Sequence, residues 1–194
     1  MGTGVGSPDV ERRLMDSFKA LVRQYPVEKI TIKQITDGAG VIRPTFYNHF
    51  HDKYEVVERV IRTEIVAPMA PLLENDMVDA AVTLMFANVQ RERAFYRSVI
   101  RMEGQNSCES IIVQCIREAL LRYIDDRLTG PRNHNWFTPQ TIAEYYARCM
   151  AYVIVEWVRR DMPLPPNEMA QIYHLINTSS LDDIIRRLKQ DPEA

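Results

Sequence analysis

The chain has 194 residues, 46% of them hydrophobic, and a formal net charge of −2 at pH 7. This length allows one large domain or a small domain followed by a medium one, and the apolar share suits a globular protein with a sizeable core. No run of about eighteen apolar residues occurs, so the sequence predicts no membrane-spanning helix. Residues 1–9 lack the basic and apolar stretches of a secretory signal. We therefore expect a cytoplasmic protein that has no membrane partner.

Charge and cysteine usage narrow the class of protein further. Residues 1–62 hold ten Lys or Arg and eight Asp or Glu, whereas residues 63–194 hold fourteen and eighteen. The basic first third favours a negatively charged partner there. The cysteines are Cys108, Cys115 and Cys149, and an odd number without a CxxC pair indicates reduced core thiols rather than disulfides or a zinc framework.

The first third of the chain has the spacing and punctuation of four helices. Apolar residues recur at helical intervals over residues 10–25, and Pro26 ends that helix. Thr31 is a suitable N-cap for a short second helix, and a third short helix is expected over residues 44–49. Asp52 then caps a fourth helix, which carries its apolar residues at helical spacing as well.

The rest of the chain is also predicted to be helical. Pro68 and Pro71 are expected to interrupt or kink the chain, which places a domain boundary between residues 1–66 and residues 67–194. Beyond it, helices are predicted near residues 78–89, 95–104, 107–128, 138–160, 167–176 and 181–188, with a polar loop at residues 129–137. The predicted fold is all-α, with an N-terminal helix-turn-helix domain and a larger C-terminal helical domain.

Residues 31–54, TIKQITDGAGVIRPTFYNHFHDKY, carry the most specific functional signal. They fit two short helices joined by a tight turn, in which Gly40 can adopt the left-handed backbone conformation. Val41 and Phe46 would fill the angle between the helices. This is the arrangement of a helix-turn-helix, whose second helix enters the major groove of double-stranded DNA.

This segment resembles the tetracycline-repressor (TetR) family of transcriptional regulators. The residues that match the end of its helix-turn-helix are Thr45, Phe46, Tyr47, His49, Phe50 and Lys53. The resemblance implies a homodimer of all-helical chains, with a shared DNA-binding domain and a divergent domain that binds a small-molecule effector. It also implies that residues 138–160 and 167–188 form a four-helix bundle with their dimer mates.

Within the family, the chain is most similar to a subgroup typified by regulators of dihydroxyacetone-kinase operons. The run TFYNHF-DKY, the preceding EKITIKQI and, more loosely, residues 94–110 carry this similarity. At least one member of the subgroup is an activator that works with a protein co-partner. A ligand-responsive repressor is therefore the first hypothesis, and an activator or an adaptor acting through a protein co-partner is the alternative.

Two positions depart from the family pattern at the start of the recognition helix. Ile42 stands where a Ser or Thr cap is frequent, and Pro44 stands where a small residue is frequent. Because proline disfavours the α conformation at the residue before it, Pro44 is expected at the first helical position and Arg43 at the cap. These departures affect which operator sequence the protein would bind, and they leave the predicted fold unchanged.

The expected DNA-binding residues divide into two groups. The resemblance implies that Tyr47 donates to a phosphate, and Lys53 and Thr31 are expected to contact the backbone too. Thr45, Asn48 and His49 are expected on the exposed side of the recognition helix. The candidates for reading bases or phosphates are therefore these three residues together with Arg43 and Pro44. Phe46 and Phe50 are expected in the core.

The C-terminal domain is rich in Met and aromatic residues, which form either ordinary core or the lining of an apolar effector pocket. The pocket candidates are Met85, Phe95, Tyr96, Met102, Tyr145, Tyr146 and Met150. His51, His134 and His174 do not stand at metal-ligand spacing, and no Gly-rich phosphate loop or HExxH motif occurs. The sequence therefore predicts no enzyme, no metal and no cofactor.

Overall fold

The computed structural model describes residues 8–104, 107–128 and 136–190, and these residues form helices and connecting turns without a β-strand. The first helices are α1 (Pro8–Val22), η1 (Val27–Lys29), α2 (Ile32–Ala39), α3 (Arg43–Tyr47) and α4 (Lys53–Ile61). They are followed by η2 (Arg62–Val66), α5 (Ala67–Glu74), α6 (Val78–Arg91), α7 (Arg93–Val99) and α8 (Cys108–Asp125). The last are α9 (Pro139–Arg159), α10 (Pro166–Thr178) and α11 (Leu181–Gln190). The predicted all-α fold is confirmed.

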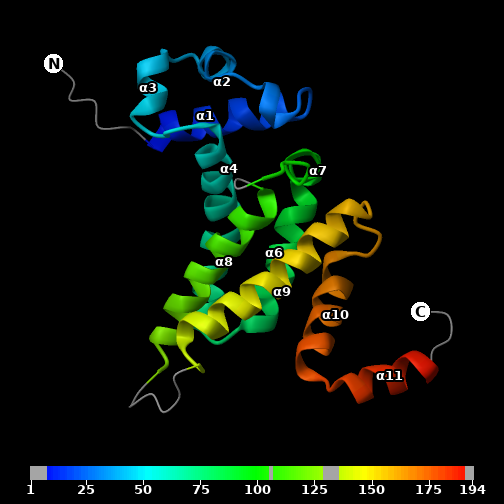
Figure 1. The fold of residues 1–194 in the computed structure, drawn as a ribbon. Helices are drawn as coiled ribbons and strands as arrows, with labels where there is room; N and C mark the ends of the chain where they lie inside the picture. The colour runs from blue at the N-terminus through cyan, green and yellow to red at the C-terminus, as the bar shows by residue number, and fades with distance from the viewer. Residues whose placement is uncertain (1–7, 105–106, 129–135, 191–194) are drawn as a thin grey trace.

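Helices α1, α2 and α3 form a small group at one end of the molecule (Figure 1). The α1 helix ends at Val22, before Pro26, as predicted. The predicted cap of α4 is also confirmed, because Asp52 Oδ1 accepts hydrogen bonds from the backbone N–H groups of Tyr54 (2.8 Å) and Glu55 (2.9 Å).

The chain from α4 to α5 stays helical, where the sequence predicted an interruption or a kink. The segment η2 is a π-helical turn, in which the Ala67 N–H reaches back to the Arg62 carbonyl. Pro68 and Pro71 lie in α5 directly after this turn, and neither can donate the backbone hydrogen bond that a continuous helix uses. The two prolines are therefore accommodated next to a locally widened turn of the helix, and no loop separates the two predicted domains.

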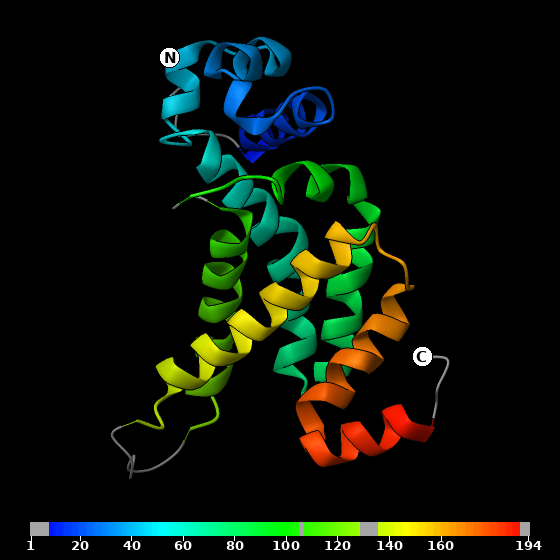
Figure 2. The same ribbon diagram turned by 45° about the vertical axis from the view of Figure 1, so that its right-hand side comes forward.

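The larger part of the molecule is built on α6, α8, α9 and α10. Helix α9 crosses α8 and packs against it, and α10 packs along α6 (Figure 1, Figure 2). The predicted cap of α9 is confirmed, because Thr138 Oγ1 accepts a hydrogen bond from the Thr141 N–H. The predicted loop at residues 129–137 lies outside the described residues, except for its last two positions. No helix among the described residues is both long and apolar enough to cross a membrane.

The two parts of the molecule meet around one lysine of α1. Lys19 Nζ lies 2.7 Å from Glu64 Oε1 in η2 and 3.0 Å from Glu92 Oε2 at the break between α6 and α7. The Lys19 side chain is only 11% exposed. A largely buried cation between two carboxylates therefore joins α1 to the larger part of the fold.

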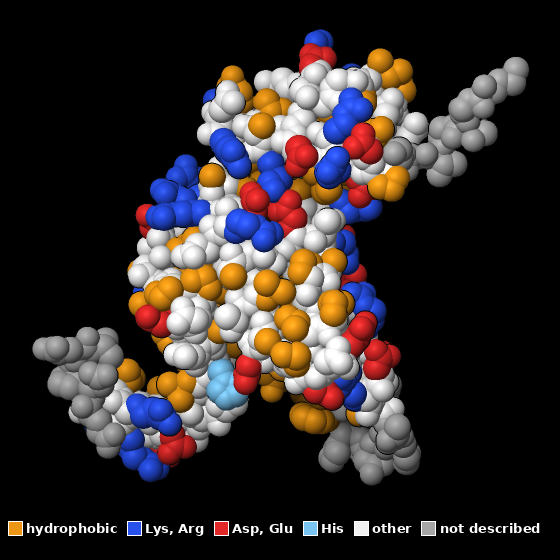
Figure 3. All heavy atoms as spheres, turned by 180° about the vertical axis from the view of Figure 1, so that it is seen from behind, with side chains coloured by type: hydrophobic (Ala, Val, Ile, Leu, Met, Phe, Trp, Pro, Cys, Tyr) orange, Lys and Arg blue, Asp and Glu red, His pale blue; other side chains and the backbone are white. Residues whose placement is uncertain are grey.

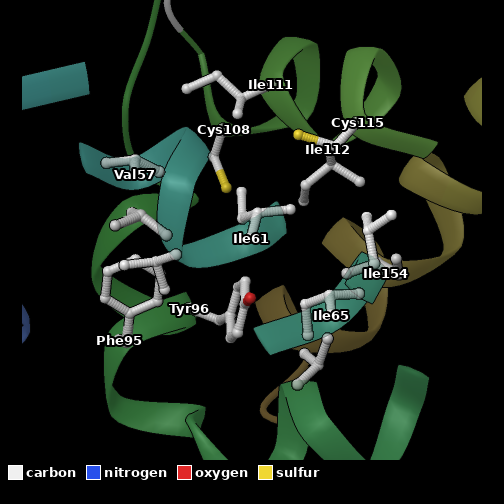
Figure 4. Packing of buried hydrophobic residues seen from close by; sticks show 14 of the residues in the cluster. Val57, Ile61, Ile65, Phe95, Tyr96, Cys108, Ile111, Ile112, Cys115 and Ile154 are labelled. Carbon is white, nitrogen blue, oxygen red and sulfur yellow. The ribbon is translucent and has the colours of Figure 1, made fainter. Parts of the chain in front are cut away.

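A continuous apolar core lies behind this junction. Tyr96 of α7 lies among Ile61, Ile65 and Ile154, which come from α4, η2 and α9 (Figure 4). Burial raises the pKa of Tyr96, and its hydroxyl has no hydrogen-bond partner among the described residues. Tyr96 is thus a packing residue of the core.

The cysteines of α8 belong to the same core. Cys108 and Cys115 are free and buried, and burial raises the pKa of each thiol to about 12. Both groups stay protonated near neutral pH, so the prediction of core thiols is confirmed for this pair.

Candidate DNA-binding surface and ligand cavity

Helix α2 is held at both ends. Thr31 Oγ1 accepts from the Gln34 N–H (3.2 Å), and Gln34 Oε1 accepts from the Thr31 N–H (2.9 Å), which forms a capping box. At the other end, Gly40 has φ +63°. The predicted cap at Thr31 and the predicted left-handed turn at Gly40 are both confirmed.

An arginine that sequence reasoning missed also fixes the turn. The Arg13 guanidinium of α1 donates hydrogen bonds to the carbonyls of Ala39 and Gly40. These are the carbonyls that the end of α2 leaves without a helical partner, and a cation is favourable at that end of a helix. The contact joins residues that are far apart in the sequence, so no local sequence pattern predicts it.

The start of α3 differs from the expectation by one residue. Ile42 has an extended backbone (φ −86°, ψ 154°) and is the N-cap, so Arg43 is the first helical residue and Pro44 the second. The Thr45 N–H bonds to the Ile42 carbonyl at 2.9 Å. The expectation that Arg43 is the cap is therefore wrong. Pro44 does not prevent a helical backbone at Arg43 here. Proline is tolerated in the first turn of a helix, because its missing N–H would have no helical partner there.

Helix α3 presents a mixed polar and apolar surface. Arg43, Pro44, Tyr47 and Asn48 are exposed, and Thr45 is half-buried. Phe46 and Phe50 are buried in the core, as predicted. Arg43 Nη2 donates a hydrogen bond to the Tyr47 hydroxyl at 3.0 Å. A candidate for reading bases and a candidate for binding phosphate are therefore hydrogen-bonded to each other.

His49 is not on the outer surface of this helix. The helix ends at Tyr47 instead of residue 49, and the His49 side chain, only 5% exposed, turns toward α1. Its Nδ1 atom lies 3.7 Å from Glu11 Oε2. The expected outward orientation of His49 is therefore wrong, because the turn after α3 rotates the residue toward the interior.

Lys53 is engaged by the protein itself. Its ammonium donates to the carbonyls of Glu28 (2.7 Å) and Ile30 (3.0 Å) around η1. Burial lowers the pKa of Lys53, and Glu28 and Asp52 oppose that shift. An ammonium has three N–H donors, so one remains for a phosphate. Phosphate contact at Lys53 stays a prediction.

A cavity of about 390 Å³ lies between α5, α6, α8, α9 and α10. Its aliphatic walls are formed by Val66, Met69, Leu73, Val78, Val82, Met85, Ile116, Ala119, Leu120, Ile124, Ile142 and Met150. Its polar atoms come from Tyr123, Tyr146, Tyr173, Asn177 and Thr178. Burial raises the pKa of Tyr173, so its hydroxyl stays neutral. Such a lining suits a mostly apolar molecule with few hydrogen-bonding groups.

The structure divides the residues that were expected to line a pocket. Met85, Tyr146 and Met150 line the cavity, whereas Phe95, Tyr96, Met102 and Tyr145 do not. Phe95 and Tyr96 belong to α7, which packs at the junction with α1. Tyr145 is 61% exposed. Adjacent residues of a helix point in different directions, so Tyr145 points outward whereas Tyr146 lines the cavity. Composition identified the aromatic residues but not the side of the helix on which each one lies.

A helix-turn-helix with an exposed second helix, joined to a helical domain with an apolar cavity, is the architecture of a DNA-binding regulator. Residues 14–60 match the family model described as bacterial regulatory proteins, tetR family, and residues 76–178 match a TetR C-terminal model described as transcriptional regulator C-terminal region. The second match alone covers more than half of the chain. The chain therefore belongs to the TetR family of transcriptional regulators.

Individual relatives are distant. The HTH-type transcriptional repressor KstR2 of Mycobacterium tuberculosis is 22% identical over 179 residues, covering 82% of this chain and 86% of that protein. Two solved structures share the fold. The dihydroxyacetone kinase operon activator DhaS has a TM-score of 0.53 at 17% identity, covering 93% of this chain and 96% of that one. NalD, the secondary repressor of the MexAB-OprM efflux pump in Pseudomonas aeruginosa, has a TM-score of 0.56 at 15% identity, covering 87% and 94%.

Proposed function

We propose that this protein is a homodimeric repressor whose binding to operator DNA is controlled by a mostly apolar ligand. The observation that carries the proposal is the presence, in one chain, of an exposed recognition helix and an apolar cavity of about 390 Å³. The printed descriptions of KstR2 and NalD as repressors support the sign of regulation. A bacterial repressor of this kind acts in the cytoplasm.

The proposed division is a DNA-binding domain at residues 1–66 and a ligand-binding and dimerisation domain at residues 67–194. The helical run from α4 through η2 to α5 joins them, and Val66 and Met69 on this run line the cavity. A ligand that shifts these residues would therefore reorient α2 and α3 through a continuous helix. A ligand changes DNA affinity only by binding the DNA-bound and free conformations with different affinity.

Within the DNA-binding domain, we assign base contacts to Arg43, Thr45 and Asn48. Tyr47, Lys53 and Thr31 are assigned to phosphates. In the first group, Arg43 and Asn48 are exposed at the two ends of α3, and Thr45 is half-buried between them. In the second group, Tyr47 ends α3, Lys53 begins α4 and Thr31 caps α2. Phosphate contacts hold the protein on any duplex, whereas contacts with base edges distinguish sequences.

The test of DNA binding is a fluorescence-anisotropy titration on a duplex selected from a random pool, with a scrambled duplex as reference. Arg43→Ala and Asn48→Ala should each cost about 1–3 kcal/mol on the selected duplex and much less on the scrambled one. Equal losses on both duplexes would contradict the base-reading roles. If the wild-type protein enriches no duplex, the alternative of an adaptor acting through a protein co-partner gains support.

The test of ligand response uses a matched pair of variants on α8. Leu120 lines the cavity, whereas the adjacent Leu121 is half-buried outside it. A thermal-shift screen of apolar compounds should find one that stabilises the wild type and the Leu121→Trp variant. The bulkier side chain of Leu120→Trp should narrow the cavity and reduce that shift. A compound that stabilises both variants equally would bind elsewhere.

A promoter reporter placed behind the selected duplex decides the sign of regulation. Expression of the protein should lower transcription, and the compound from the screen should restore it. Transcription that rises with the protein would favour the activator hypothesis, which matches the printed description of DhaS.

A further inference from the structure

Ile42 is the most conspicuous apolar side chain of the helix-turn-helix. It is 70% exposed, although its neighbours Val41 and Phe46 pack against or within the core. It occupies the N-cap of α3, and its side chain makes no capping hydrogen bond there. A serine, threonine or aspartate at this position would stabilise the helix, so isoleucine does not serve the stability of α3.

Ile42 lies beside the side chains that are proposed above to contact DNA. It directly precedes Arg43 and Pro44, which are both exposed, and Asn48 lies exposed at the other end of α3. The N-terminal residues of a recognition helix contact base edges in the major groove. Ile42 therefore forms, with Pro44, an apolar tip on a surface that is otherwise polar.

The major groove offers one apolar group to such a tip. Thymine carries a C5-methyl group there, whereas guanine, cytosine and adenine present only donors and acceptors. We propose that Ile42 reads a thymine methyl group in each half of the operator. This inference rests on the proposed DNA binding and specifies one feature of the operator sequence.

The experiment replaces each thymine of the selected duplex, one at a time, by deoxyuridine, which lacks only the methyl group. At one position per half-site, wild-type affinity should fall about fourfold, the factor expected for losing the burial of one methyl group. Ile42→Ala should bind the thymine duplex more weakly than the wild type and lose nothing further on deoxyuridine at that position.

Two further variants serve as controls. Ile42→Val keeps an apolar branched side chain and should keep the sensitivity to deoxyuridine. Asn48→Ala should also keep it, because its own loss concerns a different base pair. Circular dichroism melting should be unchanged in Ile42→Ala, since the side chain is exposed.

The possible outcomes distinguish a failure of the methyl-reading role of Ile42 from a failure of the proposed DNA binding. If the selected duplex is bound but no thymine is sensitive, the reading role of Ile42 is overturned and the repressor proposal stands. If Ile42→Ala remains sensitive at the same thymine, another residue reads the methyl group and the inference is wrong. A wild-type protein that enriches no duplex would overturn both.

Discussion

At the scale of single residues, Lys53 combines a structural contact with a predicted DNA contact. Its ammonium already binds the carbonyls of Glu28 and Ile30. Lys53→Ala should therefore lower the free energy of unfolding by about 1–2 kcal/mol, since charge-assisted hydrogen bonds are lost. It should also weaken binding to selected and scrambled duplexes alike and reduce the slope of log K against log salt by about one.

Urea unfolding and anisotropy at several salt concentrations measure the two effects separately. Lys29→Ala, which removes an exposed lysine of η1, is the matched control for the change in net charge. A Lys53 variant with lower stability and an unchanged salt slope would limit the lysine to its structural contact.

A second residue-scale prediction concerns acid stability. Arg62 bridges Glu58 and Glu118, with an Arg62 Nη1 to Glu118 Oε2 distance of 2.7 Å. The hydrogen bond from Arg62 holds the pKa of Glu118 below its usual range. A carboxyl group of this kind stabilises the fold above its unfolded pKa, and the contribution is lost as the pH falls through the folded pKa.

Glu118→Gln should therefore lose less stability than the wild type between about pH 5 and about pH 3. Because the pair is partly solvated, the difference should be about 0.5 kcal/mol. Urea titrations at both pH values measure it, with Glu109→Gln, an exposed change on the same helix, as reference. Identical pH profiles for Glu118→Gln and the wild type would contradict the assignment.

At the scale of elements, the junction of α1, η2 and the α6–α7 break depends on Lys19. Glu64 and Glu92 both approach its ammonium, and Glu64 Oε2 has no hydrogen-bond partner among the described residues. Lys19→Met would keep the length of the side chain and leave two carboxylates close together without a cation. We expect a loss of about 3 kcal/mol in the free energy of unfolding, because a largely buried pair loses one partner.

The triple variant Lys19→Met, Glu64→Gln, Glu92→Gln is the informative control. It removes the unpaired charges and should recover most of the loss, since replacing a buried ion pair as a whole is often neutral. Chemical denaturation of the wild type and both variants checks this. If the single and triple variants are equally unstable, packing rather than charge governs the junction.

At the scale of the whole molecule, exposed apolar side chains gather on the last three helices, α9, α10 and α11. Seen from behind, on the side away from α9, Lys and Arg side chains gather together with Asp and Glu where the small group of helices meets the larger part, and hydrophobic side chains lie in the middle of the larger part (Figure 3). On α9, Tyr145 and Tyr152 are each 61% exposed. The apolar residues exposed on the helices that follow are Ile172, Ile176, Leu181, Ile185 and Leu188. A surface of this composition favours a protein–protein interface.

We therefore expect a homodimer in solution, formed through α9, α10 and α11. Tyr145→Glu combined with Tyr152→Glu should give a monomer at micromolar concentration, because like charges would face each other across a two-fold interface. Sedimentation velocity measures the oligomeric state. Met77→Glu changes an exposed apolar residue outside these helices and should leave the dimer intact. A wild-type protein that is monomeric at micromolar concentration would contradict the expected homodimer.

The sequence by itself determined the features that depend on local chemistry. Thr31, Asp52 and Thr138 cap helices because their side-chain oxygens reach backbone N–H groups two or three residues ahead. Phe46 and Phe50 are core because they share the inner face of one short segment. Such relations span a few residues, so spacing and residue type suffice to predict them.

Only the tertiary structure decided which way certain side chains face and which distant groups they meet. His49 turns inward to Glu11, Lys53 binds carbonyls around η1, and Arg13 caps α2. The cavity includes Tyr146 but not Tyr145, since adjacent residues on a helix point in different directions. These outcomes depend on how helices far apart in the sequence pack together, and that packing is set by the complementary shapes of whole surfaces rather than by any local run of residues.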